Sequence, residues 1–304
     1  DRTVKMVMEF KRTSKINVII LDSDGGHTIP ELSLSSSFFK LTKYANNIST
    51  YSYFMFCDQD DIWHTNKIER MVETIVLEES KNPSEAILVH SDLKLVDMEG
   101  KLIHHSLWDW QKITPWRNTT SRLLLQNTVT GCATIMNRAL SENLIEGPHL
   151  FYHDHRLALV ASLIGRVVPL NEQLIDYRQH GDNVSGAGVI AQGIVAKTIH
   201  ALALLIPDRV KFLIFEKKET ISSSARLDKL RSIITFGVLE ATELLDLYGN
   251  VISIESRRML IEISELRKKS LVNRIWILVT RKCLPDSFYR AIGLLTAEVL
   301  TDRK

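Results

Sequence analysis

Hydrophobic and polar positions follow two periods along the first part of the chain, and each period predicts a different kind of element. Continuous apolar runs at residues 16–22, 53–57 and 86–90 predict strands that are buried on both faces, as in a parallel sheet. Residues 35–44 and 66–79 have the apolar spacing of helices between those strands. This alternation predicts an α/β sheet flanked by helices.

The helix expected at residues 66–79 has one apolar face. Its members recur at helical spacing and are Ile68, Met71, Val72, Ile75 and Val76. We expect this face to pack on the sheet.

The alternation continues to about residue 190 and then stops. Strands are expected at residues 132–136 and 167–177, a helix at 154–164, and a polar loop at 181–188. Beyond that loop the pattern is helical, over residues 191–206, 219–248, 252–270 and 285–300. The sequence therefore predicts an α/β domain over residues 1–190 and a helical region over residues 191–304.

The composition is that of a globular protein whose charge is unevenly distributed. The 304 residues are 45% hydrophobic and 24% charged, which is sufficient for a buried core, and the net charge of +2 does not indicate a nucleic acid partner. Residues 191–304 contain 19 Lys and Arg against 13 Asp and Glu, so their net charge is +6 and that of the preceding residues is −4. A basic tail is compatible with an anionic membrane surface.

Cysteine usage and hydropathy bear on the compartment. Cys57, Cys132 and Cys283 are odd in number and lack paired spacing, which argues against a disulfide framework or a zinc site and for a reducing compartment. The longest apolar stretch, at residues 157–170, contains Arg166 and is shorter than the roughly 20 residues that a spanning helix needs. We expect a cytoplasmic protein, either free or attached peripherally at the inner face of the membrane.

The strongest chemical signal is the heptapeptide CDQDDIW at residues 57–63. Its three carboxylates, Asp58, Asp60 and Asp61, follow a hydrophobic strand, and open α/β sheets bind ligands at that edge. Clustered carboxylates repel one another unless a cation neutralises them, and oxygen ligands suit Mg²⁺ or Mn²⁺. The alternative is a solvated acidic turn that caps the next helix.

With its flanking residues, this segment resembles the DxD segment of the family 2 glycosyltransferases, especially the bacterial rhamnosyltransferase-like members. The resemblance covers residues 35–190 and includes four further motifs in the family's order. These are VHSDL at residues 89–93, NTVTGCA at 127–133, His153-Asp154, and YRQHGDN at 177–183. It implies a GT-A fold, in which a mostly parallel sheet is flanked by helices, and an enzyme of polysaccharide biosynthesis.

The beginning of the chain departs from the family pattern. Family members begin with a strand that carries a TYNG-like turn, and a second strand ends in a DDGSTD-like motif. Residues 1–3 of this chain resemble only the last residues of that second motif, with residues 4–11 as the helix that follows. The resemblance therefore implies a truncated chain that lacks its first βαβ unit, with an incomplete nucleotide pocket and an exposed sheet edge.

The resemblance also implies roles for individual residues. Asp154 would be the catalytic base that removes the proton from the acceptor hydroxyl, and the sugar would be transferred with inversion. Metal ligands would come from Asp60, Asp58 and His180. Contacts to the nucleotide sugar would come from Asp58, Asp61, Arg178 and Asp92. The acceptor would lie against Thr130, Gly131, His153 and Trp108. The implied donor is a nucleotide-diphosphate sugar, dTDP-L-rhamnose being the first choice, and the acceptor is a cell-surface polysaccharide or a lipid-linked sugar.

Each of these assignments has a structural alternative. The position of Asp154 is also compatible with a plain helix N-cap. Arg178 and His180 are also compatible with a structural loop that is held by hydrogen bonds. Asp92 follows His90 in a strand, where such polar pairs are often structural. Trp108 is as well suited to a buried aromatic pair as to a sugar-binding platform.

The helical tail contains a Trp-bearing apolar segment with basic flanks. Residues 275–279 (IWILV) lie between Arg267, Lys268, Lys269 and Arg274 on one side and Arg281 and Lys282 on the other. That pattern suits peripheral attachment to an anionic membrane, and the alternative is a core-facing helix with a solvated edge.

Two other functions remain open at the level of sequence. One is a catalytically inactive truncated remnant or interaction module. The other is a metal-dependent nucleotidyl or phosphoryl transferase, which also uses clustered carboxylates, although the sequence has no P-loop or other phosphate-binding glycine motif.

Overall fold

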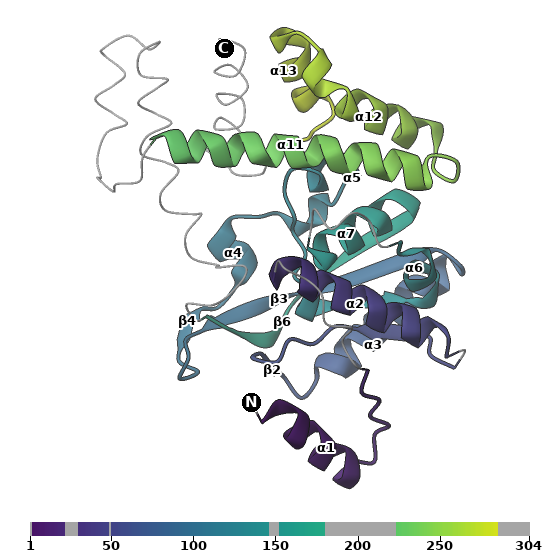
Figure 1. Ribbon diagram of the computed structural model, residues 1–304, viewed down its shortest axis with the longest axis vertical. Coiled ribbons are helices and arrows are strands. Elements are labelled where there is room, and N and C mark those ends of the chain that lie inside the picture. Colours follow the sequence, from purple (N-terminus) through teal and green to yellow (C-terminus); the bar gives the residue numbers. More distant parts are fainter. Residues whose placement is uncertain (1, 22–29, 49, 146–151, 180–222, 285–304) are drawn as a thin grey trace.

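The computed structural model describes residues 2–21, 30–48, 50–145, 152–179 and 223–284 (Figure 1). Within them an α/β body is built around a six-stranded sheet, and a group of helices lies at one end of it (Figure 1). The predicted loop at residues 181–188, the predicted helices at 191–206 and 285–300, and His180 all lie outside the described residues.

The sheet is mixed. Its strand order is β1-β5-β3-β6-β2, and β4 pairs with the far end of β3. The strands are β1 (Tyr53–Met55), β2 (Ile62–Trp63), β3 (Ala86–Val96), β4 (Leu102–His104), β5 (Thr134–Asn137) and β6 (Gly165–Arg178). Of these described pairings only β3 with β6 is parallel, and the others are antiparallel.

The expectation of a mostly parallel sheet is therefore not met by these strands. Continuous apolar runs report that a strand is buried on both faces, and they carry no information about its direction. Here β5 lies between β1 and β3 and runs antiparallel to both. The predicted strands at 53–57, 86–90, 132–136 and 167–177 do form, with shifted ends.

The two faces of the sheet are covered by different helices, as the alternation of side chains along β3 shows. Ile87 and Val89 point to α3 (Lys67–Lys81), where they pack with Met71 and Ile75. Leu88 points to the opposite face, which α7 (His153–Ile164) covers. The central strand is thus buried on both sides, and its residues through Leu93 are almost fully enclosed.

The buried face of α3 differs from the predicted one by a small rotation. Met71 and Ile75 are fully buried as expected, but Ile68 and Val76 are exposed. Lys67 is fully buried instead, one helical turn before Met71. A pattern that scores only apolar residues cannot find a lysine on the inner face.

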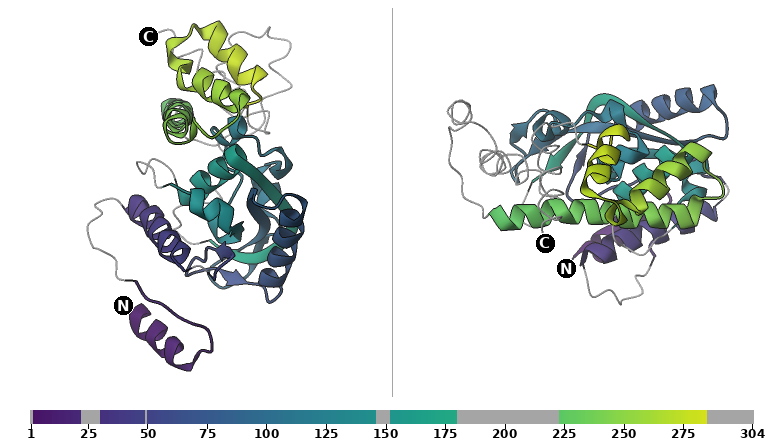
Figure 2. Two further views of the ribbon diagram at one scale, coloured as in Figure 1. Left: turned by 90° about the vertical axis from the view of Figure 1, so that its right-hand side faces the viewer. Right: turned by 90° about the horizontal axis from the view of Figure 1, so that it is seen from above.

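The strand predicted at residues 16–22 is wrong for its described part, because residues 17–21 have no regular structure. No described strand lies beside them, and a strand needs a hydrogen-bonded neighbour to form. The preceding helix α1 (Thr3–Thr13) buries none of its residues, and it lies apart from the sheet in Figure 1 and in the left view of Figure 2.

The remaining helices of the described residues belong either to the α/β body or to the tail. The α/β body has α2 (Pro30–Asn46), α4 (Leu107–Gln111), α5 (Thr120–Leu123) and α6 (Arg138–Asn143). The tail has α11 (Ser223–Tyr248), α12 (Ile254–Ser264) and α13 (Leu271–Thr280). Single 3₁₀ turns occur at Pro115–Arg117, Gly131–Ala133 and Leu266–Lys268. The predicted helices at 35–44, 66–79, 154–164, 219–248 and 252–270 are confirmed over their described parts.

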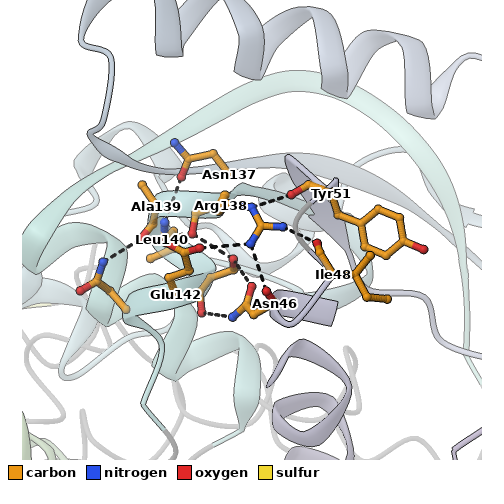
Figure 3. A network of polar contacts seen from close by, with 10 residues as sticks. Asn46, Ile48, Tyr51, Asn137, Arg138, Ala139, Leu140 and Glu142 are labelled. Carbon is orange, nitrogen blue, oxygen red and sulfur yellow. Dashed lines mark hydrogen bonds and ion pairs between the residues drawn. The ribbon is translucent and has the colours of Figure 1, made fainter. Parts of the chain in front are cut away.

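The segment that leads into β1 is held by Arg138 (Figure 3). Its guanidinium donates hydrogen bonds to the backbone carbonyl oxygens of Tyr51 at 2.7 Å, Ile48 at 2.7 Å and Asn46 at 3.2 Å. The Asn46 side chain in turn bonds to Ser141 of α6. Arg138 therefore fixes the end of α2 and the start of β1, and so the position of the acidic turn that follows β1.

The tail packs on the α/β body through α11, which crosses α5 (Figure 1). Gly237 permits this crossing, because a Cβ atom there would lie 2.7 Å from Leu125 and 2.9 Å from the carbonyl oxygen of Leu124. Across the same contact, buried Arg156 of α7 forms ion pairs with Glu240 and Glu243. One core cluster spans both regions, and the predicted boundary near residue 190 lies outside the described residues.

Candidate functional site

The acidic turn after β1 meets the 3₁₀ turn at Gly131–Ala133. One ligand atom each from Asp58, Asp61 and Cys132 lies within 4.8 Å of the others. Asp58 and Asp61 are half-buried, and Cys132 is fully buried. The DxD segment and the NTVTGCA segment, predicted separately from the sequence, are therefore neighbours in space.

Crowding and burial keep these carboxylates from ionising easily. Burial raises the pKa of Asp58 to about 6, with further contributions from the charges of Asp61 and Asp60. Burial likewise raises the pKa of Asp61, while the Cys132 thiol and the Arg178 backbone N–H partly offset this by hydrogen bonding. Asp60, which the resemblance implies as a metal ligand, is near enough to act through its charge but is outside the closest group.

A buried cation that the sequence analysis missed lies beside this group. Lys67 is fully buried, and its Nζ donates a hydrogen bond to the carbonyl oxygen of Cys132 at 3.0 Å. The same nitrogen lies 3.1 Å from the centre of the Trp63 ring. Burial lowers the pKa of Lys67 to about 8, although the charges of Asp58 and Asp61 act in the other direction. The sequence did contain a signal for this burial, because Lys67 is spaced to lie on the same face of the helix as Met71 and Ile75.

Asp154 stands at the first turn of α7, on the other side of the Gly131 turn. Its carboxylate accepts a hydrogen bond from the backbone N–H of His155 at 2.7 Å, and the backbone of Gly131 also bonds to it. Desolvation is the main cause that raises its pKa to about 7, and the charge of Asp58 adds to it. Asp154 and Asp58 are thus electrostatically coupled across the site.

His153 and Gly131 pack against each other next to Asp154. A Cβ atom at Gly131 would collide with the His153 ring, so only glycine fits there without a shift. The ring stacks on Phe38 with centroids 4.0 Å apart and meets Phe56 edge-on at 5.2 Å. Burial lowers the pKa of His153 to about 4, so the ring is neutral at neutral pH. Thr130, half-buried, immediately precedes this turn.

Arg178 comes from the end of β6 and reaches the same edge. Its backbone N–H donates to Asp61 Oδ1 at 3.2 Å, and its guanidinium donates to the carbonyl oxygen of Met98 at 3.1 Å. The predicted neighbour in the YRQHGDN motif, His180, lies outside the described residues.

Asp92 and Trp108, by contrast, are engaged inside the protein. Asp92 is 1% exposed and accepts hydrogen bonds from the backbone N–H groups of Leu93 and Trp108 and from the Gln173 amide. Trp108 is 5% exposed and packs beside His90. Neither offers a free surface to a ligand, so the structural alternative describes both better, and we do not include them in the candidate site.

The oxygen atoms of Asp58 and Asp61 fit a hard divalent cation. Mg²⁺ is usually held by one or two carboxylates together with substrate phosphates and water, and Mn²⁺ also prefers oxygen ligands. The Cys132 sulfur fits less well, because burial raises the pKa of its thiol well above the usual value and keeps the proton on sulfur. We assign Cys132 the role of a hydrogen-bond donor to the carboxylates.

Comparison with known proteins adds no identification. No model of a known protein family matches this chain, and no curated protein matches its sequence. The functional conclusion therefore depends on the residues and their geometry.

Proposed function

We propose that this chain carries the active site of an inverting, metal-dependent glycosyltransferase, and that its mixed sheet is the core of a GT-A-like fold. The observation that carries the proposal is the convergence of Asp58 and Asp61 with Asp154 across the Gly131 turn. Two coupled carboxylates suited to a cation face a third whose pKa of about 7 suits proton transfer near neutral pH. The resemblance of five ordered motifs supports the same reaction class.

On the donor side, Asp58 and Asp61 would hold Mg²⁺ or Mn²⁺, with Asp60 supporting them by its charge. When bound, the cation supplies positive charge that offsets the charge developing on the leaving nucleoside diphosphate. The backbone N–H of Arg178 bonds to Asp61, and we propose that its guanidinium, which is always charged and forked, contributes phosphate contacts. His180 remains a candidate from the sequence alone.

On the acceptor side, Asp154 would take the proton from the attacking hydroxyl. The acceptor oxygen then forms a bond to the anomeric carbon, while the bond from that carbon to the diphosphate breaks and its electron pair leaves with the diphosphate. One displacement inverts the anomeric configuration. Thr130, Gly131 and His153 border Asp154 and would line the acceptor position.

The substrates follow from the resemblance. The donor we propose is dTDP-L-rhamnose, and the acceptor is a cell-surface polysaccharide or a lipid-linked sugar. Cys57, Cys132 and Cys283 are free thiols, which supports a reducing compartment such as the cytoplasm.

Calorimetric titration of the whole chain with dTDP, with and without Mn²⁺, tests the donor site. We expect Mn²⁺-dependent binding that Asp58→Asn abolishes and that Asp109→Asn, a matched change at an exposed carboxylate of α4, leaves unchanged. The absence of binding in every condition would favour an inactive remnant. With dTDP-L-rhamnose and acceptor, release of dTDP supports glycosyl transfer, whereas release of rhamnose 1-phosphate would identify a nucleotidyl transferase instead.

A further inference from the structure

Helix α13 has an apolar stripe on its outer face. Val272, Trp276 and Val279 are 74%, 61% and 51% exposed, and their spacing places them on one side of the helix. The opposite side is the one used for packing, because Ile277 and Leu278 are buried in the core. The exposed stripe is therefore not needed for the fold of this helix.

The surroundings of the stripe are basic. Residues 267–282 contain six Lys and Arg and no Asp or Glu, so the segment has a net charge of +6. The nearest carboxylates before it offset two of these charges, because Glu262 pairs with Arg281 at 2.7 Å and Glu265 with Lys269 at 3.7 Å, so the segment and these two partners together have a net charge of +4. Lys268 and Lys282 are exposed and flank the two ends of α13.

The position of α13 leaves it accessible. In two views it lies with α12 beyond α11, at the end of the molecule opposite α1 (Figures 1 and 2). No helix among the described residues is long and apolar enough to cross a bilayer. A surface attachment, parallel to the membrane plane, is the geometry that a ten-residue amphipathic helix allows.

We propose that the α13 stripe docks onto a bilayer surface rich in anionic lipid headgroups. Val272 and Val279 supply apolar contact, Trp276 is of the residue type that prefers the interface, and the flanking lysines attract the negative surface. A second copy of this chain is a poorer occupant, because two faces with a charge of this sign would repel each other. The proposal is independent of the glycosyltransferase assignment, although attachment would bring the site near a lipid-linked acceptor.

Sedimentation of the whole chain with vesicles tests the proposal. We expect binding to phosphatidylcholine vesicles that contain phosphatidylglycerol, little binding to phosphatidylcholine alone, and release at high salt. The double variant Trp276→Ser with Val279→Ser should partition about tenfold more weakly, as lost apolar contact predicts. The double variant Lys268→Gln with Lys282→Gln should also bind anionic vesicles about tenfold more weakly, and its binding to neutral vesicles should equal that of the parent.

The matched control is Leu77→Ser, which removes an equally exposed apolar side chain from α3, and it should bind as the parent does. Thermal melting checks that each variant is folded. The proposal is overturned if the parent does not bind anionic vesicles, if it binds neutral vesicles equally well, or if the stripe variants bind unchanged. A parent dimer that the stripe variants dissociate, seen by sedimentation velocity, would also overturn it.

Discussion

The ammonium nitrogen of Lys67 donates a hydrogen bond to the backbone carbonyl oxygen of Cys132, with 3.0 Å between the two atoms. This contact joins the helix after the acidic turn to the segment that borders Asp154. It also places a resident positive charge beside Asp58 and Asp61. Lys67 thereby supports both halves of the proposed site without lying on its surface.

Lys67→Met should reduce the free energy of unfolding by about 1–3 kcal/mol, because it removes a buried charged hydrogen bond to Cys132 and the cation beside the half-buried Asp58 and Asp61. Urea unfolding measures the change. Lys81→Met, at the exposed end of the same helix where Lys81 pairs with Glu78, should cost less than about 1 kcal/mol. Equal losses in the two variants would mean that Lys67 has no special electrostatic role.

Asp154→Asn should lower kcat by about 10²–10⁴-fold, since amide nitrogen and oxygen cannot accept the hydroxyl proton. The affinity for dTDP with Mn²⁺, measured by calorimetry, should stay within about threefold of the parent value because Asp154 is not in the proposed donor contacts. Asp109→Asn serves again as the exposed-carboxylate control. Full activity in Asp154→Asn would exclude Asp154 as the base.

The rate should depend on pH through the same residue. A base acts only when deprotonated, and the pKa of Asp154 is raised to about 7. The value of kcat/KM should therefore rise about tenfold per pH unit below about 7 and level off above it. The pH dependence of kcat/KM is measured with saturating Mn²⁺. A profile that is flat from pH 5 to 8 would contradict the assignment.

Glu240→Gln should make stability less sensitive to pH. Burial raises the pKa of Glu240 to about 7 from 4.5, despite the ion pair with Arg156. The folded state therefore binds the proton more tightly, and this stabilising contribution is complete below pH 4.5 and lost as pH rises through about 7. Relative to the parent, the variant should gain up to about 3 kcal/mol between pH 4 and pH 8.

Urea unfolding at both pH values measures that difference. Glu255→Gln, an exposed change on α12, should alter stability by less than about 0.5 kcal/mol at either pH. If the parent and Glu240→Gln lose stability in parallel as pH rises, Glu240 is not responsible for the pH dependence.

Gly131→Ala should disturb the site more than the fold. Its new Cβ would collide with the His153 ring, which the Phe38 and Phe56 rings hold in place. We expect a loss of about 1–3 kcal/mol in unfolding free energy and a fall in kcat of about tenfold or more, because Asp154 follows His153 directly. Gly100→Asn, at a positive φ with open space around it, should leave both nearly unchanged. Parent-like kcat in Gly131→Ala would contradict this close packing.

The local pattern of the sequence determined most elements of the α/β body. Helical spacing predicted α3 and α7, and apolar runs predicted β1, β3 and β6. These predictions succeed because the burial pattern of one helix or strand depends on residues that are close together in the sequence. The carboxylates of the acidic turn and Asp154 were also found from local motifs. The strand predicted at residues 16–22 is wrong over its described part, because a strand depends on a neighbour that its own residues do not specify.

What only the tertiary structure decided were relations between distant segments. The antiparallel insertion of β5 between β1 and β3 depends on chain path, which the apolar content of a strand does not encode. The burial of Lys67 depends on a carbonyl group 65 residues away. Asp92 and Trp108 are buried together, because the Trp108 backbone N–H donates a hydrogen bond to the Asp92 carboxylate. Residue type and spacing thus predicted the candidate groups, while packing and desolvation decided which of them lie close together.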